Sequence, residues 1–153
     1  MKINSGMVVV VSVSVMKDGK ILLVQENKEH VRKKWGFPSG RMELGEDICY
    51  AACREAKEET GYDIQLTSTT GVYNFISSFN HQVIMFHFTG VITGGSLGYN
   101  PAEILNAHWV TLEEIKNMDT NDVRDPHVVQ EILQRLEKVE TYPIDIFKRF
   151  LGE

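Results

Sequence analysis

Residues 40–62 read GRMELGEDICYAACREAKEETGY, and this stretch determines how the rest of the chain is interpreted. Glu58 and Glu59 follow Glu55 by three and four residues, and these offsets return side chains to one face of an α-helix. Two such charges about 5 Å apart repel by roughly 3 kcal/mol at an effective dielectric of about 20. A hard cation such as Mg²⁺ reverses that sign, because it binds carboxylate oxygens together with phosphate oxygens of a ligand. The spacing therefore predicts a helix that presents carboxylates to divalent cations.

Three glutamates at this spacing are, by themselves, more often a solvated helix face. Here four further residues accompany them, and seven fixed identities at about 7% each coincide by chance about once in 10⁸. These four are Gly40, Glu46, Arg54 and Gly61. Small and apolar side chains fall at helical spacing on the opposite side, so we expect them to pack inward while the acids face outward. They are Ile48, Cys49, Ala52, Cys53 and Ala56.

The stretch resembles the Nudix box, G-x5-E-x7-R-E-U-x-E-E-x-G-U, where U is a bulky apolar residue. Every polar identity matches; Ala56 is small for the first U, and Tyr62 is aromatic where an aliphatic residue is more usual. The resemblance is strong here and looser over the remaining chain. It implies a single MutT-like domain over residues 1–153 with the Nudix-type α/β/α sandwich and a mixed central sheet.

The resemblance also implies an Mg²⁺-dependent hydrolase, with Mn²⁺ possible, that cleaves a phosphoanhydride with metal-activated water. The implied metal ligands are Glu55, Glu58, Glu59 and the backbone carbonyl of Gly40. Glu58 is favoured as the general base, and Glu103 is the runner-up. Glu103 precedes Trp109 as in many Nudix chains, although a surface loop acid is an equally good interpretation.

The catalytic group expected from the resemblance consists of Arg54, Glu55, Glu58 and Glu103. Within it, Arg54 is expected to act mainly by holding a box glutamate in place. Its expected partner is Glu46. Basic and aromatic side chains are the candidates for binding phosphates and stacking on a base. A solvated charge run and strand core residues are their plainer interpretations. The candidates are Lys33, Lys34, Arg41, Phe75, Phe79 and Arg124, with Tyr73 and His87 as further stacking candidates.

Composition limits the possible partners. The formal net charge is −5, of which −3 falls within residues 40–62, and no broad basic field indicates nucleic-acid binding. No apolar run is long enough to cross a bilayer. Cys49 and Cys53 are expected as buried small hydrophobes in a reducing cytoplasm. The sequence leaves monomer and homodimer open, and the apolar tail 144–151 either joins two subunits or closes the core.

Periodicity and turn signals predict the remaining elements. We expect strands at 9–15 and 20–25 joined at Asp18-Gly19, a charged loop at 26–34 and an irregular segment at 35–40. We also expect strands at 71–78, 82–92 and 107–110, and a helix at 111–117 opened by a capping box of Thr111 and Glu114. A last helix starting at Pro126 should carry an apolar stripe of Val129, Ile132, Leu133, Leu136 and Val139.

The substrate is the least determined feature. MutT-like chains carry Asn-Glu-Pro where this chain has Arg124-Asp125-Pro126, which makes an oxidised purine less favoured. Residues 121–126 and 142–144 resemble small bacterial Nudix phosphatases that act on nucleoside di- and triphosphates or thiamine-type pyrophosphates. A catalytically silent Nudix-fold sensor is disfavoured because no box acid is lost. An RNA 5′-end pyrophosphohydrolase is disfavoured by the net acidity.

Overall fold

A computed structural model describes residues 6–152 as a mixed sheet between helices. The strand order is β3-β2-β1-β6-β5-β8, with β4 paired to β1 and β7 paired to β2. The strands are β1 (Met7–Lys17), β2 (Lys20–Glu26), β3 (Trp35–Gly36), β4 (Ser39–Arg41), β5 (Tyr62–Ile76), β6 (Gln82–Gly95), β7 (Ile104–Val110) and β8 (Tyr142–Pro143). β1 and β6 are parallel, whereas β1 pairs antiparallel with β2 and β4.

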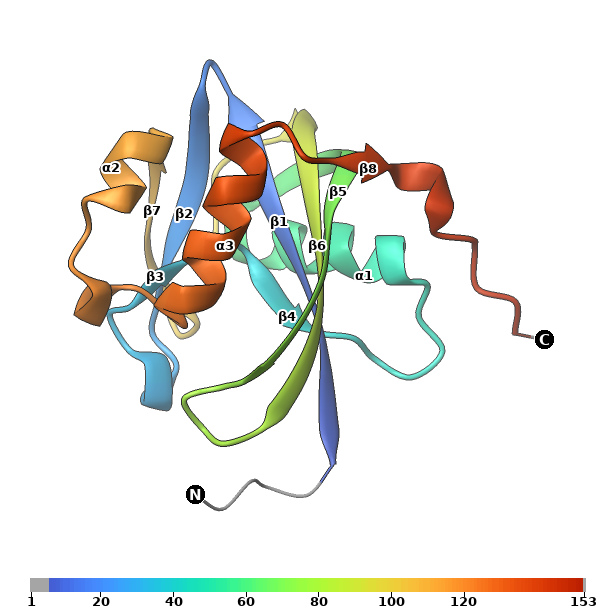
Figure 1. Ribbon diagram of the computed structural model, residues 1–153, viewed down its shortest axis with the longest axis horizontal. Helices are drawn as coiled ribbons and strands as arrows, with labels where there is room; N and C mark the ends of the chain where they lie inside the picture. Colours follow the sequence, from blue (N-terminus) through green and yellow to red (C-terminus); the bar gives the residue numbers. More distant parts are fainter. Residues whose placement is uncertain (1–5, 153) are drawn as a thin grey trace.

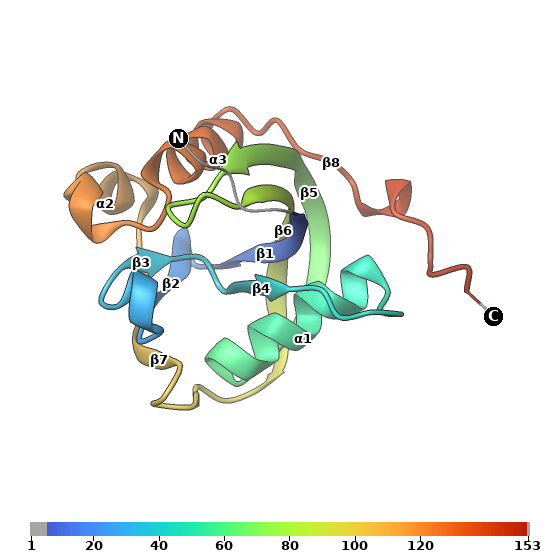
Figure 2. The same cartoon turned by 90° about the horizontal axis from the view of Figure 1, so that it is seen from below.

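Helices cover both faces of this sheet. They are α1 (Ile48–Thr60), α2 (Leu112–Lys116) and α3 (Pro126–Glu137), with 3₁₀ turns at 29–31, 120–122 and 144–146. Figures 1 and 2 show α1 on one side and α2 with α3 on the other. The expected α/β/α sandwich with a mixed sheet is therefore confirmed. Within residues 6–152, no helix is long and apolar enough to cross a bilayer.

β1 lies inside the sheet, between β2 and β6, and its valines are buried there. Val11, Val13 and Val15 are fully buried, and β1 turns into β2 through Asp18 and Gly19, which have φ of 51° and 74°. Positive φ at both positions gives the tight hairpin that the Asp-Gly pair predicts. This part of the sequence analysis is confirmed.

Several strand boundaries were wrong, and these differences matter most for the site. Glu26 ends β2 instead of starting a loop, Ser39–Arg41 pairs with Val10–Ser12, and β7 begins at Ile104. β5 starts at Tyr62 directly after α1, and its register against β6 shifts at three places. Each shift breaks the alternation of buried and exposed side chains along the strand. A single alternating pattern therefore does not run along the whole strand in the sequence, and its first half was not predicted.

Two core clusters lie on opposite faces of the sheet. Against α1, the buried residues Ala51, Ala52 and Ala56 let the helix approach β1 closely, whereas Cys49 and Cys53 are only partly buried and reduced. On the other face, α3 contributes Val129, Ile132 and Leu133. The Val139 prediction was wrong: this residue follows the helix end, has φ 54° and is 77% exposed.

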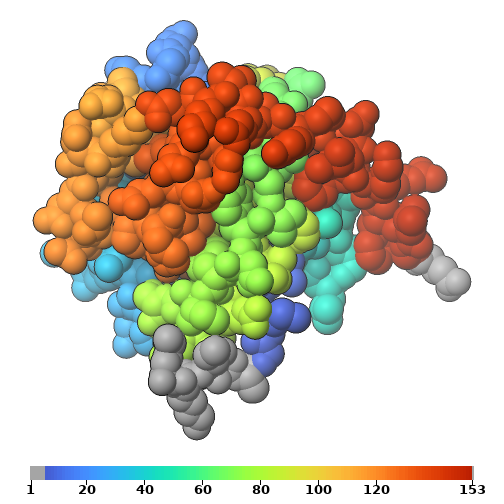
Figure 3. Space-filling model, in the orientation of Figure 1, coloured from blue at the N-terminus to red at the C-terminus, as the bar shows by residue number. Residues whose placement is uncertain are grey.

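The C-terminal segment runs outward beyond β8 (Figure 3). Phe147 packs its ring against Phe86 and Phe88 at 5.7 and 5.0 Å between centroids. Ile146, Phe150 and Leu151 are exposed. Ile144 also packs against the α1-side core, so two residues of the apolar tail help to close it.

Candidate active site

The box forms a loop, a helix and a turn that are fixed at both ends. Asp47 caps α1 by accepting hydrogen bonds from Cys49 N at 2.9 Å and Tyr50 N at 3.2 Å. Gly61 ends the helix with φ 83°, and a Cβ there would lie 2.2 Å from Ser96 O. Only glycine fits this left-handed position against the backbone of the 96–98 loop. The two ends hold the glutamates of α1 against β4.

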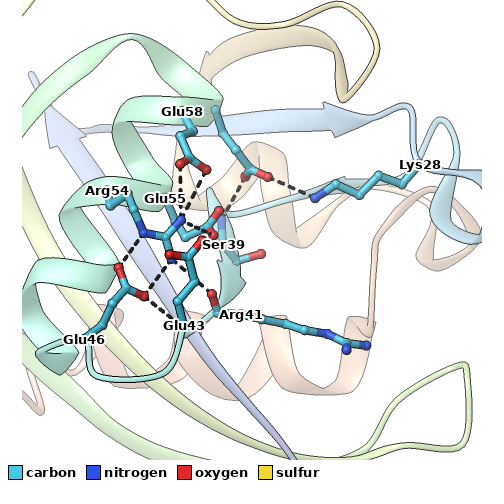
Figure 4. A network of polar contacts seen from close by, with 9 residues as sticks. Lys28, Ser39, Arg41, Glu43, Glu46, Arg54, Glu55 and Glu58 are labelled. Atoms are coloured by element: carbon cyan, nitrogen blue, oxygen red, sulfur yellow. Dashed lines mark hydrogen bonds and ion pairs between the residues drawn. The ribbon is translucent and has the colours of Figure 1, made fainter.

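Arg54 joins the loop to the helix, as expected. Its Nε and Nη2 donate to Glu46 at 2.5 and 2.9 Å, and Nη1 donates to Glu55 at 2.8 Å and Glu58 at 3.2 Å. Nη2 also reaches the carbonyl of Arg41 at 3.1 Å. Figure 4 shows this guanidinium at the centre of the carboxylates. The hydrogen bonds from Arg54 lower the pKa of Glu46, so the pair stays ionised and orients two of the three glutamates.

Glu59 corrects the expectation that the box acids face outward. Its side chain is 1% exposed, accepts from Ser39 N at 2.9 Å and lies 3.4 Å from Lys28 Nζ. Burial, with the nearby charge of Glu26, raises its pKa to about 8. Burial also raises the pKa of Glu55, whereas the side chain of Glu58 is 51% exposed. The three carboxylates therefore lie in three different environments, and Glu59 is the one packed under the sheet.

Gly40 makes room for the carboxylate of Glu55. A Cβ built on Gly40 would lie 2.1 Å from Glu55 Cδ, far inside van der Waals contact. A side chain at this position would therefore displace the Glu55 carboxylate, which lies directly on the glycine backbone. This close approach places the backbone of Gly40 beside the Glu55 carboxylate.

Gly40→Ala is expected to push the Glu55 carboxylate out of position. Because a displacement of about 1 Å in a catalytic site costs on the order of 100-fold in rate, we expect kcat/KM to fall between tenfold and 100-fold. The melting temperature should change by only a few degrees. Gly98→Ala is the matched control, since a Cβ there meets nothing nearer than Ser96 O at 3.9 Å. Equal activity of both variants would contradict the proposed importance of the Glu55 position.

Glu26 and Lys28 join the site although the sequence analysis placed them in a charged loop. The side chain of Glu26 is 2% exposed, and its Oε1 accepts from Arg124 Nη1 at 3.2 Å. Its Oε2 has no hydrogen-bond partner among the described residues and lies 3.9 Å from Lys28 Nζ. The missed signal was the alternation of Leu22, Val24 and Glu26, which places a carboxylate on the buried face of β2.

Two adjoining pockets open beside these carboxylates. The first is mainly apolar and includes Phe37, Phe75, Met85, Val129 and Ile132 among its lining residues. The second carries basic groups, namely Lys28, His30, Arg41, His81 and Arg124, with Gly40 and Phe79. They share a wall made of Val10, Ser39, Ser77, Val83, Arg124 and Asp125. An anionic group in the second pocket thus lies next to the box glycine.

The structure brings some of the predicted substrate residues to these pockets and leaves others outside. Phe75 lines the apolar pocket, Phe79 and Arg41 line the basic one, and Arg124 lines both. Figure 4 shows the Arg41 side chain directed away from the carboxylates. Lys34 lines a third pocket, which shares Ser77, Ser78, Arg124 and Asp125 with the basic one.

Lys33 lies outside the linings of these pockets. It has φ 69°, and its N–H donates to Glu26 O at 2.7 Å. The two further stacking candidates line neither the apolar nor the basic pocket: His87 is fully buried, and Tyr73 is partly buried against the α3-side core with its hydroxyl donating to Thr70 at 2.8 Å. Lys33 thus contributes backbone structure to the site, and the other two make packing contacts outside the pocket linings.

The loop that carries Glu103 is fastened to the end of β2. Asn27 N donates to Glu103 O at 2.9 Å, and the side chain of Asn27 donates to Pro101 O at 2.8 Å. Because Asn27 stands between Glu26 and Lys28, these bonds hold the Glu103 loop beside the buried carboxylate. The backbone is positioned for a role at the site, and the role of the Glu103 carboxylate stays a prediction.

The donor set fits a hard divalent cation. Within residues 6–152, no three Asp, Glu, His or Cys side chains already stand together as a metal cage, so the expected convergence of three carboxylates is not preformed. Instead, Glu55 and Glu58 bind Arg54, and Glu59 binds Lys28. The free Oε2 of Glu26 and the carboxylates of α1 supply oxygen ligands of the kind that Mg²⁺ and Mn²⁺ prefer.

Comparisons with known proteins agree with this geometry. The chain is 38% identical over 100 residues to "Putative nudix hydrolase 1" of Caenorhabditis elegans and 36% identical over 104 residues to the human 8-oxo-dGDP phosphatase NUDT18. These matches cover 65% and 66% of this chain but only 26% and 31% of the relatives. A putative 8-oxo-dGTP diphosphatase of Bacillus subtilis is 33% identical over 99 residues, which is 65% of this chain and 63% of that protein.

A solved NUDIX hydrolase from Nitrosomonas europaea has the same fold. Its TM-score is 0.82 at 29% identity, and the match covers 97% of this chain and 100% of that one. The sequence profile of the NUDIX domain matches residues 6–132, a range that contains the box, both pockets and most of α3. The chain therefore belongs to the NUDIX domain family.

Proposed function

We propose that this protein hydrolyses a phosphoanhydride bond of a nucleoside diphosphate or triphosphate, or of another diphosphate linked to a moiety X, with Mg²⁺ or Mn²⁺. The observation that carries the proposal is the shared wall of the two pockets. A base or other apolar leaving group fits the apolar pocket, and its phosphates then enter the basic pocket beside Gly40. The scissile bond thereby comes to lie next to the carboxylates of α1.

Each residue has a physical task in this arrangement. The bound cations supply charge neutralisation of the phosphates, and this chain's carboxylates hold them. Glu55 and Glu59 are the firmest ligand candidates, because both are held by neighbouring donors close to β4. Glu58 is the most exposed of the three and has the freedom to accept a proton from an attacking water. Arg54 is a positioning residue, and Arg124 and Arg41 place positive charge on the phosphate pocket.

A purine nucleoside diphosphate is the first substrate to test. Asp125 precedes α3 and has the φ and ψ values 45° and 61°, yet among the described residues its carboxylate makes no capping hydrogen bond. The carboxylate is 13% exposed and lines both pockets. A carboxylate at the rim of an apolar pocket accepts hydrogen bonds from the ring N–H and amino group of a guanine-type base. In this proposal the Asp125 carboxylate takes over the base recognition that the asparagine provides in MutT-like chains. The named activities of the human and Bacillus relatives point to the same class of base.

The test measures release of inorganic phosphate and pyrophosphate from a substrate panel, with and without Mg²⁺. The panel contains dGDP, 8-oxo-dGDP, 8-oxo-dGTP, dCDP, ADP-ribose and thiamine pyrophosphate. We expect Mg²⁺-dependent release, fastest for a guanine-type diphosphate. Release from none of them would contradict the proposal and favour a binding protein that does not cleave.

Asp125→Asn should lower activity selectively by substrate. Because a hydrogen bond to a charged acceptor contributes about 1.5 to 3 kcal/mol, kcat/KM for guanine-type diphosphates should fall between tenfold and 100-fold. For dCDP it should change by less than about threefold, since asparagine tolerates the left-handed backbone equally well. An equal loss for both bases would show that Asp125 does not read the base.

A further inference from the structure

Lys28 lies between two buried carboxylates at the margin of the basic pocket. Its Nζ is 3.4 Å from Glu59 Oε2 and 3.9 Å from Glu26 Oε2. The two glutamate side chains are 1% and 2% exposed, whereas the lysine side chain is 45% exposed. The positive charge that compensates a buried acidic pair therefore comes from a partly solvated group.

The arrangement of charges around this pair is uneven. Glu26 Oε1 is bound by Arg124, and Glu59 Oε1 is bound by the backbone of Ser39. The two Oε2 atoms face Lys28, and that of Glu26 has no hydrogen-bond partner among the described residues. Lys28 thus occupies the position between two hard oxygen atoms where a divalent cation also fits.

Lys28 reaches the phosphate pocket without a change of backbone. It lines the basic pocket together with Ser39, Gly40, Arg41 and Arg124. A lysine carries its charge on a flexible stem with rotatable donors, so the ammonium can exchange partners by rotation of its side chain. A cation at Glu59 repels the ammonium, and a phosphate in the pocket attracts it.

We propose that Lys28 is an internal counter-ion of the Glu26–Glu59 pair, displaced by the divalent cation onto a substrate phosphate. The inference rests on the proposed function and adds a positioning residue to it. While the site holds no metal, the ammonium lies between the two buried carboxylates and helps to hold them in place. When metal and substrate bind, the same charge helps to hold the phosphates.

Lys28→Met tests the exchange through two effects of opposite direction. Binding of Mn²⁺ alone, followed by electron paramagnetic resonance without substrate, should become about three- to tenfold tighter, because the competing cation is gone. The affinities are compared on the alkaline plateau of each titration, where protons compete least with the metal. The KM for a nucleoside diphosphate should rise about tenfold while kcat changes much less, because a charge-assisted contact to phosphate is lost.

Two further variants control for charge and for loss of a lysine. Lys28→Arg keeps the charge and should leave both Mn²⁺ affinity and KM close to those of the unmodified protein. Lys116→Met removes a lysine of similar exposure, 34%, that pairs with Glu137 between α2 and α3. It should change neither quantity by more than about twofold.

The outcomes separate this inference from the function on which it rests. If the unmodified protein binds Mn²⁺ and hydrolyses the nucleotide while Lys28→Met has equal or weaker Mn²⁺ affinity or an unchanged KM, the counter-ion role is overturned and the proposed function stands. If the unmodified protein neither binds Mn²⁺ nor hydrolyses any substrate of the panel, both are overturned. Tighter Mn²⁺ binding together with a higher KM supports the exchange.

Discussion

Glu59→Gln is expected to reduce kcat at least about 10³-fold while the protein remains folded. Removal of one preorganised electrostatic group costs 10²- to 10³-fold in comparable sites, and here the same change weakens cation binding as well. The glutamine keeps the volume of the buried side chain and an oxygen that accepts from Ser39 N. It also removes a buried charge that lies near Glu26, so the free energy of unfolding should change by about 1 kcal/mol or less.

Steady-state hydrolysis at saturating Mg²⁺, together with a thermal melt, measures both parts of this expectation. Glu137→Gln is the matched control, because it makes the same change at an exposed glutamate far from the box. A Glu59→Gln protein that keeps full activity would show that this carboxylate has been misassigned. A variant that unfolds would show that the residue serves the scaffold instead.

The sequence predicted the box in more detail than any other part of the chain. Helical spacing and end signals predicted α1, its left-handed stop at Gly61 and the pair of Arg54 with Glu46, all of which the structure contains. These are local features, since each depends on offsets of eight residues or fewer. Local backbone geometry alone is sufficient to predict them.

The burial of Glu59 and the presence of Glu26 required contacts between distant residues. Glu59 is 20 residues from Ser39 and 31 from Lys28, and Glu26 is 98 from Arg124. A helical wheel places Glu55, Glu58 and Glu59 together but does not say which of them lies under β4. The strand β2 was likewise recognised, but its last residue was not, because a charged side chain after an apolar run is usually exposed.

The substrate pockets depended on the fold in a similar way. Phe75, Phe79 and Arg124 were candidates because of their chemistry, and the structure places them around adjoining pockets. Tyr73, on β5 with Phe75, and His87, on β6, were candidates for the same reason, yet neither lines these two pockets. Alternation along β5 does not separate Tyr73 from Phe75, because both side chains pack against the α3-side cluster. Contacts with the rest of the fold decide which aromatic side chain lines a pocket, and no period in the sequence reveals them.

His87 makes acid stability a second measurable property of this fold. The imidazole of this β6 residue is fully buried, with Nδ1 2.5 Å from Ser12 Oγ and Nε2 2.7 Å from Ser14 Oγ on the neighbouring strand β1. Its ring also lies 4.8 Å from that of Phe37. Burial lowers the pKa of His87 from 6.5 to about 3, so the folded protein keeps this side chain neutral where the unfolded chain is protonated.

The direction of the pH effect follows from the bound protons. Below pH 6.5 the unfolded state binds one more proton than the folded state, so the free energy of unfolding falls as the pH falls, until it levels off near pH 3. At about 1.4 kcal/mol per pH unit, the loss from this residue is about 2 kcal/mol by pH 5 and about 5 kcal/mol by pH 3. Its contribution is constant above pH 6.5.

Urea titrations between pH 3 and pH 8 measure this slope. His87→Gln should be less stable than the unmodified protein at pH 7, because the amide replaces both serine contacts imperfectly. Its free energy of unfolding should nevertheless fall less steeply below pH 6.5, so the two curves converge in acid. His108→Gln, a change at an exposed histidine of β7, controls for the loss of a histidine as such. Parallel curves for the unmodified and His87→Gln proteins would mean that the buried imidazole accepts a proton without cost, which the burial between two serines and Phe37 opposes.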